Sequence, residues 1–278
     1  MKTFLNLTLF ALIHFTSQSQ NLYVRASTGY NFPAARSNME NYLMNKWVAV
    51  VYPYNVDRFQ YSLGKGQNIN VELGYTTKHN IGFELNFSYL RGMKNIHEGI
   101  YFENDIFRRE LWGQFYAVNP GAHFLCPLGK ASLKMHVSGV FGMGNMYFNL
   151  IGIFNGEEWM RYENKFSGGY YLGFKAGVDF IYPISNRWSL FLNVNWVNAN
   201  YSPARAKTKY MESSIDKTHL LSVGERETIF TNSIEKGQYN PDVPSQRLRE
   251  NFAASSIGLQ VGIQWNLWTK KQEEDKKD

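Results

Sequence analysis

The sequence predicts an all-β fold: eight antiparallel strands that close into an up-and-down barrel and cross a membrane. Long segments alternate apolar and polar residues with a period of two, which is typical of strands whose two faces meet different surroundings. The connections between these segments alternate between long and short. Beyond the N-terminal residues no apolar run approaches the roughly 18 residues of a membrane helix, so strands are the expected means of crossing.

The clearest hairpin lies between residues 170 and 196. Its first strand reads YYLGFKAGVDFIYP and its second reads WSLFLNVNW, and in each the bulky apolar residues share one face. Each strand reaches the length of about 9 to 11 residues that a tilted strand needs to cross a bilayer. Aromatic residues stand near the strand ends, where rings sit at the membrane interfaces. They are Tyr170, Tyr182, Trp188 and Trp196.

The same alternation predicts six further strands. They cover residues 22–32, 68–76, 81–90, 109–126, 133–144 and 253–268. Short turns are expected at 77–80, 127–130 and 183–186, and long loops at 33–67, 91–108, 149–164 and 202–251. Pro120 interrupts the fourth strand. Because proline removes a ladder hydrogen bond, we expect a bulge at residues 119–121.

The loop lengths predict the cellular location. Residues 1–19 have the charge, short apolar core and small residues of a cleaved signal peptide. In outer-membrane barrels the periplasmic turns are short, the extracellular loops are long, and an even strand number brings both termini to the periplasm. We therefore expect an exported protein in the outer membrane of a Gram-negative bacterium, with the barrel in residues 20–268 and a charged, disordered tail in 269–278.

Alternation alone does not say which face is outside. A soluble eight-stranded barrel of lipocalin type would turn its apolar face inward. The polar face of these strands is rich in Gly, Ser and Asn, which suits a narrow interior, whereas the Phe, Tyr, Trp and Leu of the other face are too bulky to fill it. The sequence therefore favours the membrane barrel.

Six charged residues fall on the polar face. They are Arg25, Lys134 and Lys175, with Glu72, Glu84 and Asp179. A balanced set in a narrow lumen should pair, because an unpaired charge away from water is costly. We expect a salt-bridge and hydrogen-bond network that plugs the lumen, with an ion or proton path as the alternative.

Three stretches carry a family resemblance. They are the end of the signal, SQSQ, followed directly by NLYVRASTGYNF, the hairpin GYYLGFKAGVDFIYPISNRWSLFLNVNW, and the closing IGLQVGIQWNLW. In these stretches the chain resembles the small outer-membrane β-barrel proteins of the porin-like or OmpA/OmpX-like type common in Bacteroidota. The resemblance implies that Trp268 or Trp265 is the terminal aromatic residue read by the barrel-assembly machinery. It indicates a class and not a function.

A search for chemistry finds no catalytic, cofactor or metal site, and we expect no enzyme. The histidines lack ligand spacing, and no Ser, His and carboxylate trio stands out. His123 and His136 flank one hairpin and are expected to lie close together as hydrogen-bonded interior residues. Lys and Arg are interleaved with Asp and Glu, so no nucleic-acid surface is predicted. Cys126 is the only cysteine, which excludes a disulfide within the chain.

Function is expected in the long loops, because such loops usually carry function or disorder. Their aromatic residues are candidate contacts for a protein or glycan partner. They are Trp47, Tyr52, Tyr54 and Phe59 in the first loop and Tyr210, Phe230 and Tyr239 in the last. The alternative is that these rings only pack the loops over the barrel mouth.

The sequence thus predicts a structural or binding protein that also contacts outer-membrane lipid and lipopolysaccharide. A small porin or transport channel, and an outer-membrane lipid-modifying enzyme, are the alternatives. The oligomeric state is not predicted.

Overall fold

The structure is a computed structural model that describes residues 19–34, 37–38, 60–102, 105–212, 218–233 and 240–269. The expected signal peptide, apart from its last residue, and nearly all of the charged tail lie outside these residues. Fourteen strands form one sheet, and β2 (Ser37–Asn38) pairs separately with β3 (Gln60–Tyr61). No helix in the described part of the chain is long and apolar enough to span a membrane.

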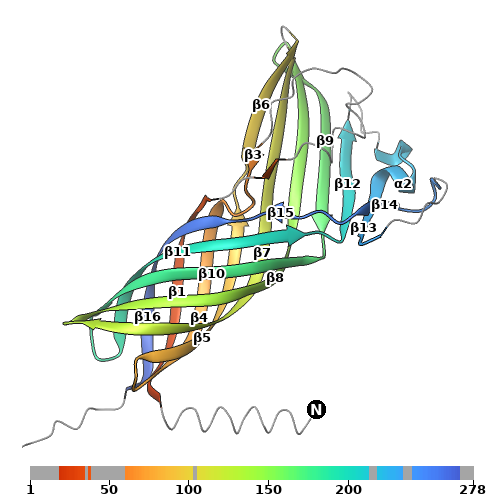
Figure 1. The fold of residues 1–278 in the computed structure, drawn as a ribbon. Coiled ribbons are helices and arrows are strands. Elements are labelled where there is room, and N and C mark those ends of the chain that lie inside the picture. Colours follow the sequence, from red (N-terminus) through yellow and green to blue (C-terminus); the bar gives the residue numbers. More distant parts are fainter. Residues whose placement is uncertain are drawn as a thin grey trace, which may run out of the picture.

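Antiparallel pairing closes the long strands into a ring (Figure 1). In order around the ring they are β1 (Ser19–Pro33), β4 (Gly66–Thr77), β5 (Ile81–Gly92), β7 (Asp105–Leu128), β8 (Ala131–Phe154), β10 (Tyr170–Pro183), β11 (Trp188–Ser202) and β16 (Ser256–Thr269). β16 pairs with β1 along its length, so the ring has no free edge. The predicted strands lie within these elements, except that residues 253–255 precede β16.

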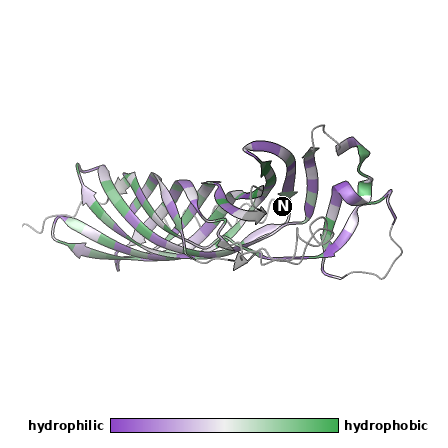
Figure 2. Cartoon of the chain, turned by 90° about the horizontal axis from the view of Figure 1, so that it is seen from above, coloured by the Kyte–Doolittle hydropathy of each residue, from purple (hydrophilic) through white to green (hydrophobic). Residues whose placement is uncertain are grey.

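The ring strands turn their apolar side chains outward and their polar side chains inward. On β5 the outward residues Ile81, Phe83, Leu85 and Phe87 are 37–53% exposed. The inward residue Glu84 is only 6% exposed. Hydrophobic and hydrophilic residues alternate in this way along the ring strands (Figure 2). An interior filled by the apolar face, as in the lipocalin alternative, is excluded because those side chains lie on the outside.

The three short turns lie together at one end of the ring, the short-turn end. They are residues 78–80, 129–130 and 184–187. Asn80 and Gly129 adopt φ angles of 64° and 62° there. This left-handed region favours Gly and Asn and allows the chain to reverse sharply. The beginning of β1 and the end of β16 lie at the same end, where Asn21 faces Thr269.

At the other end the sheet continues beyond the ring. β7 and β8 have 24 residues each and pair outside the ring with β6 (Asn95–Phe102) and β9 (Glu157–Ser167). β12 (Arg205–Glu212), β13 (Glu227–Thr231) and β14 (Ser245–Leu248) follow β9. These strands, with the outer parts of β7 and β8, are the extension, seen at the top and right of Figure 1. The short elements η2 (Thr218–Leu220), α2 (Val223–Arg226) and β15 (Phe252–Ala253) complete this end.

The extension corrects two expectations. Eight strands were predicted, but the sheet has fourteen. Much of the predicted loops 91–108 and 149–164 forms β6, β9 and the outer parts of β7 and β8. Asn155 and Gly156, with φ angles of 50° and 84°, make the turn between β8 and β9. An Asn-Gly pair is a strong hairpin signal, so the sequence did carry the information.

The bulge expected at Pro120 is absent. Val118 pairs with Phe141 and Gly121 with Ser138, so the register between β7 and β8 is the same on both sides of the proline. Pairing with β8 lapses only at Asn119 and Pro120. Because Pro120 lacks an N–H group, the ladder omits a bond there without taking up an extra residue.

Candidate functional site

A buried ion-pair network fills the ring interior near the short-turn end. The Nζ atom of Lys134 lies 2.7 Å from Glu72 and 2.6 Å from Glu84. It also lies 3.4 Å from Asp179. Arg25 binds Asp179 at 2.5 Å and lies 3.7 Å from Glu72. These residues come from β1, β4, β5, β8 and β10 and are at most 9% exposed.

The strand register explains why these charges meet. Arg25 stands opposite Glu72 across β1 and β4, and Lys134 stands opposite Asp179 across β8 and β10. Directly opposite residues on one face of a sheet have Cβ atoms about 5 Å apart, close enough for salt bridges. The ring then brings the two pairs together across the lumen, so that each cation contacts more than one carboxylate.

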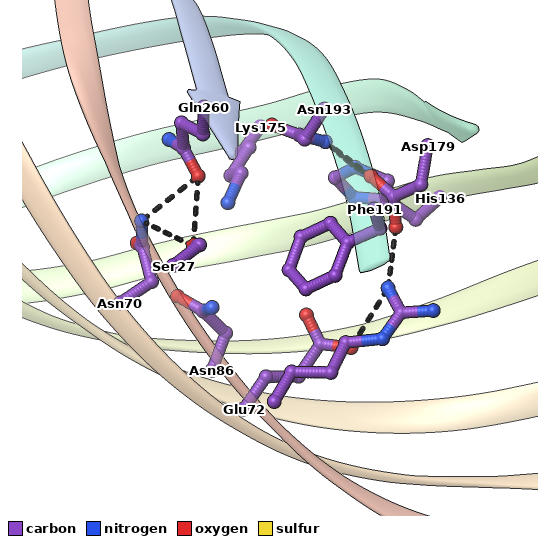
Figure 3. Close-up of a pocket in the computed structure, with 11 residues that line it drawn as sticks. Ser27, Asn70, Glu72, Asn86, His136, Lys175, Asp179, Phe191, Asn193 and Gln260 are labelled. Carbon is purple, nitrogen blue, oxygen red and sulfur yellow. Dashed lines mark hydrogen bonds and ion pairs between the residues drawn. The ribbon is translucent and has the colours of Figure 1, made fainter. Parts of the chain in front are cut away.

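Neutral groups complete the network (Figure 3). The Nε atom of Arg25 donates a hydrogen bond to Gln264 at 2.6 Å. The guanidinium also lies 4.7 Å from the ring centroids of both Tyr23 and Phe191. Asn193 donates a hydrogen bond to Asp179. Buried charges are tolerated when they are both paired and hydrogen-bonded, and this set meets both conditions.

His123 and His136 are cross-strand neighbours on β7 and β8, as expected. Their Nδ1 atoms lie 3.4 Å and 3.5 Å from Glu84. His123 also lies 3.0 Å from the hydroxyl group of Thr76. Within the described residues, no group of three or more His, Cys, Asp or Glu side chains is arranged to hold a metal ion. Both histidines therefore belong to the interior network.

Lys175 lies apart from the other five interior charges. It is 7% exposed and forms no ion pair with another described residue, although it shares the inward face of β10 with Asp179. Asp179 is four positions further along the strand, a distance of about 13 Å. Lys175 therefore stands between the ion pairs and the next layer of the interior.

That layer is built from asparagine side chains. Asn31, Asn68, Asn70 and Asn119 line a cavity together with Lys175. The Oδ1 atoms of these four residues are buried and have no hydrogen-bond partner among the described residues. This cavity has a volume of about 20 Å³ and the one beside the ion pairs has about 10 Å³, which gives each room for roughly one water. Polar side chains line most of both cavities.

Aromatic residues close the interior beyond this layer. Phe115 stacks on Tyr171 with ring centroids 4.6 Å apart and meets Tyr201 edge-on at 5.1 Å. The hydroxyl group of Tyr201 lies 2.9 Å from the carbonyl oxygens of Gly144 and Gly168. All three rings are buried and belong to one apolar cluster that continues into the extension.

The polarity of the two faces reverses along β7 and β8. On β8 the inward residues change from Lys134 and His136 to Met146 and Phe148, all of them buried. The outward residues change in the opposite sense, from the apolar set Met135, Val137, Phe141 and Met143 to the partly polar set Asn145, Tyr147 and Asn149. The apolar exterior therefore ends near Met143, within a continuous strand.

The structure places the candidate loop contacts in different surroundings. Tyr210 lies on β12 and is half-buried. Phe230 is 2% exposed and packs against Phe166 in the extension core, so it does not present a surface to a partner. Trp47, Tyr52, Tyr54, Phe59 and Tyr239 lie outside the described residues.

No protein-family model matches the chain, and no curated protein matches it. It is similar to a solved structure of Neisserial surface protein A (NspA), with 9% identity, 88% of this chain and 96% of that chain covered, and a TM-score of 0.34. It is also similar to Ail, the attachment invasion locus protein of Yersinia pestis, with 9% identity, coverage of 90% and 98%, and a TM-score of 0.31. At these TM-scores neither likeness bears on what this chain does.

Replacing Lys134 by methionine should destabilise the protein by about 3–5 kcal/mol, because Glu72 and Glu84 would lose their shared cation. Lys175→Met is the matched control. Its loss of stability should be clearly smaller than that of Lys134→Met, because Lys175 forms no ion pair with another described residue, whereas Lys134 pairs with Glu72 and Glu84. Adding Glu84→Gln to Lys134→Met should restore part of the loss. Urea unfolding of the reconstituted protein measures the free energy of unfolding of all three variants. Equal losses for the two lysine variants would contradict this role.

Proposed function

We propose that this protein is an integral outer-membrane β-barrel of eight strands with a closed lumen. It acts as a structural or binding protein through the part that projects beyond the membrane. The observation that carries the proposal is the belt of exposed apolar side chains on the outside of a ring whose interior is charged.

The belt is far larger than a soluble surface normally carries. Large apolar residues on every ring strand from β4 to β16 are exposed, among them Val71, Phe87, Val118, Val137, Phe174, Leu192 and Val261. Soluble monomers rarely expose contiguous apolar patches beyond a few hundred Å². Lipid is the surrounding that makes such a belt favourable, and a closed ring leaves no unpaired strand edge in lipid.

Aromatic pairs stand at both limits of the belt. At the short-turn end Trp188 stacks on Trp265 with ring centroids 5.8 Å apart. At the other limit Tyr89 stacks on Tyr116 at 4.8 Å. Girdles of aromatic residues mark both interfaces of outer-membrane barrels. The reversal of polarity on β8 begins just beyond the second limit, as expected where a strand passes from lipid into water.

The orientation follows from the two ends of the ring. We assign the short-turn end to the periplasm and the extension to the cell exterior, because outer-membrane barrels have short periplasmic turns and long outer segments. The predicted signal peptide agrees with export of the chain.

The closed interior favours a structural or binding role over transport. Each charge near Lys134 has at least one partner of opposite sign, and the cavities beside them have room for about one water each. A substrate or solute has no space there, which also argues against catalysis inside the barrel. A protein or glycan partner would therefore bind at the extension, where Tyr210 is a candidate contact. Trp47, Tyr52, Tyr54, Phe59 and Tyr239, which lie outside the described residues, stay candidates from the sequence.

Leu192→Arg should destabilise the protein by about 2–4 kcal/mol, because Leu192 lies within the belt and would place a charge in lipid. Ile96→Arg is the matched control: Ile96 is 58% exposed on β6, compared with 47% for Leu192 on β11. In water this change should cost at most about 0.5 kcal/mol. Urea unfolding in lipid vesicles compares the two, and equal costs would argue against membrane insertion.

Two single-cysteine variants test the orientation. In a Cys126→Ala background, Ser233→Cys introduces a thiol on the extension and Lys130→Cys introduces one in a short turn, both at exposed positions. A maleimide attached to a polymer too large for porins should label Ser233→Cys in intact cells. It should label Lys130→Cys only after the cells are broken. The reverse pattern would overturn the assignment of the two ends.

In a planar bilayer the purified protein should show little conductance, because a ring of about eight strands leaves room only for side chains. Single-channel recording measures this, with heat-unfolded protein as the control. A large and steady current would support the porin alternative instead.

A further inference from the structure

A charged surface lies on the outside of the molecule, just beyond the apolar belt. Strand pairing aligns the outward residues there in two rows across β5, β7, β8, β9 and β12. The first row is Arg91, Gln114, Asn145, Ser167 and Arg205, and the second is Trp112, Tyr147, Lys165 and Lys207. Lys94 lies beside Trp112. We call these residues the cation band.

The cation band carries an excess of positive charge. Lys94 and Lys207 pair with Glu110 at 2.6 Å and Glu227 at 2.8 Å. Arg91, Lys165 and Arg205 form no ion pair with any other described residue. The band therefore holds three cations without an ion-pair partner among the described residues, and these attract anionic groups at the same level of the exterior.

An aromatic platform lies between these cations. Trp112 and Tyr147 stack with ring centroids 5.2 Å apart and ring planes 13° apart. The Nζ atom of Lys94 is 5.1 Å from the Trp112 ring, and that of Lys165 is 5.7 Å from the Tyr147 ring. Trp and Tyr with neighbouring cations are typical of the level at which lipid headgroups lie.

An apolar groove of about 410 Å³ leads up to the band. It lies on the outside of β4, β5, β7 and β8 and is lined mainly by Ile69, Val71, Phe87, Tyr89, Tyr116, Val118, Phe141 and Met143. Its outer limit, at Tyr89 and Tyr116, is two residues along each strand from Arg91 and Gln114 in the first row of the band. A hydrocarbon chain in the groove would thus place its headgroup on the cations.

We propose that the groove and the cation band together form a binding site for a phosphate-bearing lipid of the surrounding leaflet. The acyl chain lies in the groove, one phosphate contacts Arg91, a second phosphate of the same headgroup contacts Lys165 or Arg205 three or four strands away, and the sugar or glycerol part rests against Trp112 and Tyr147. This site rests on the proposed membrane insertion. Free phosphate would use the cations without the groove, so the groove favours a lipid.

The test uses the full-length protein in phosphatidylcholine vesicles with a small fraction of bisphosphorylated lipid A. After extraction into mild detergent, native mass spectrometry counts the lipid A that remains bound. The triple variant R91E/K165E/R205E should retain at least about tenfold less, because each cation near an anionic headgroup contributes to binding. Val118→Trp, which fills the groove, should also reduce retention.

Each variant has a matched control. K78E/K130E/R187E makes the same charge change at exposed positions of the short-turn end, and Val194→Trp enlarges an outward residue elsewhere in the belt. Both controls should retain lipid A as the unmodified protein does. Flotation with vesicles and heat-modifiable migration on gels show that each variant is inserted and folded. The milder variant R91Q/R205Q replaces the triple variant if that one does not fold.

Several results would overturn the site. They are unchanged retention in either the charge or the groove variant, equal retention of dephosphorylated lipid A, and displacement of lipid A by millimolar inorganic phosphate. Failure of the unmodified protein to float with vesicles would instead overturn the proposed membrane function.

Discussion

The ion pairs around Lys134 and Arg25 are the interaction on which the rest of the ring depends. The interior charges are at most 9% exposed, so each needs a partner of opposite sign and further hydrogen bonds. Five strands supply these charges, and they meet only if every strand keeps its polar face inward. The apolar side chains are then obliged to lie outside, and the exterior is suited to lipid.

The polarity of the inward and outward faces changes along β7 and β8, the two longest strands. In the lower part of β8 the interior is polar and the exterior apolar, and beyond Met143 the polarities exchange. Successive side chains still point to opposite faces through this change, because that alternation follows from the geometry of the strand backbone and not from the solvent. β8 thus belongs both to the ring, which we propose is surrounded by lipid, and to the extension, which has its own apolar core.

These features bear on where the proposed binding would take place. Among the described residues, ion pairs, asparagine amides and the rings around Phe115 occupy the interior, and the cavities beside the ion pairs and the asparagines have room for about one water each. The extension and the cation band present charged and aromatic side chains at and beyond the belt edge. A ring that displays side chains of this kind at its outer end is consistent with the proposed binding at a membrane surface.

The sequence by itself determined where the ring strands lie and which six charges share the polar face, because both follow from alternation along one strand. It did not determine that Lys175 stands apart from the other five, since that depends on register between strands distant in the sequence. It also predicted loops where the extension forms strands: their faces reverse the polarity expected from the ring, and of the extension only the turn at Asn155 and Gly156 carried a clear hairpin signal. Tertiary structure decided these points, because only ring closure defines which face is inside and which charges lie within contact distance.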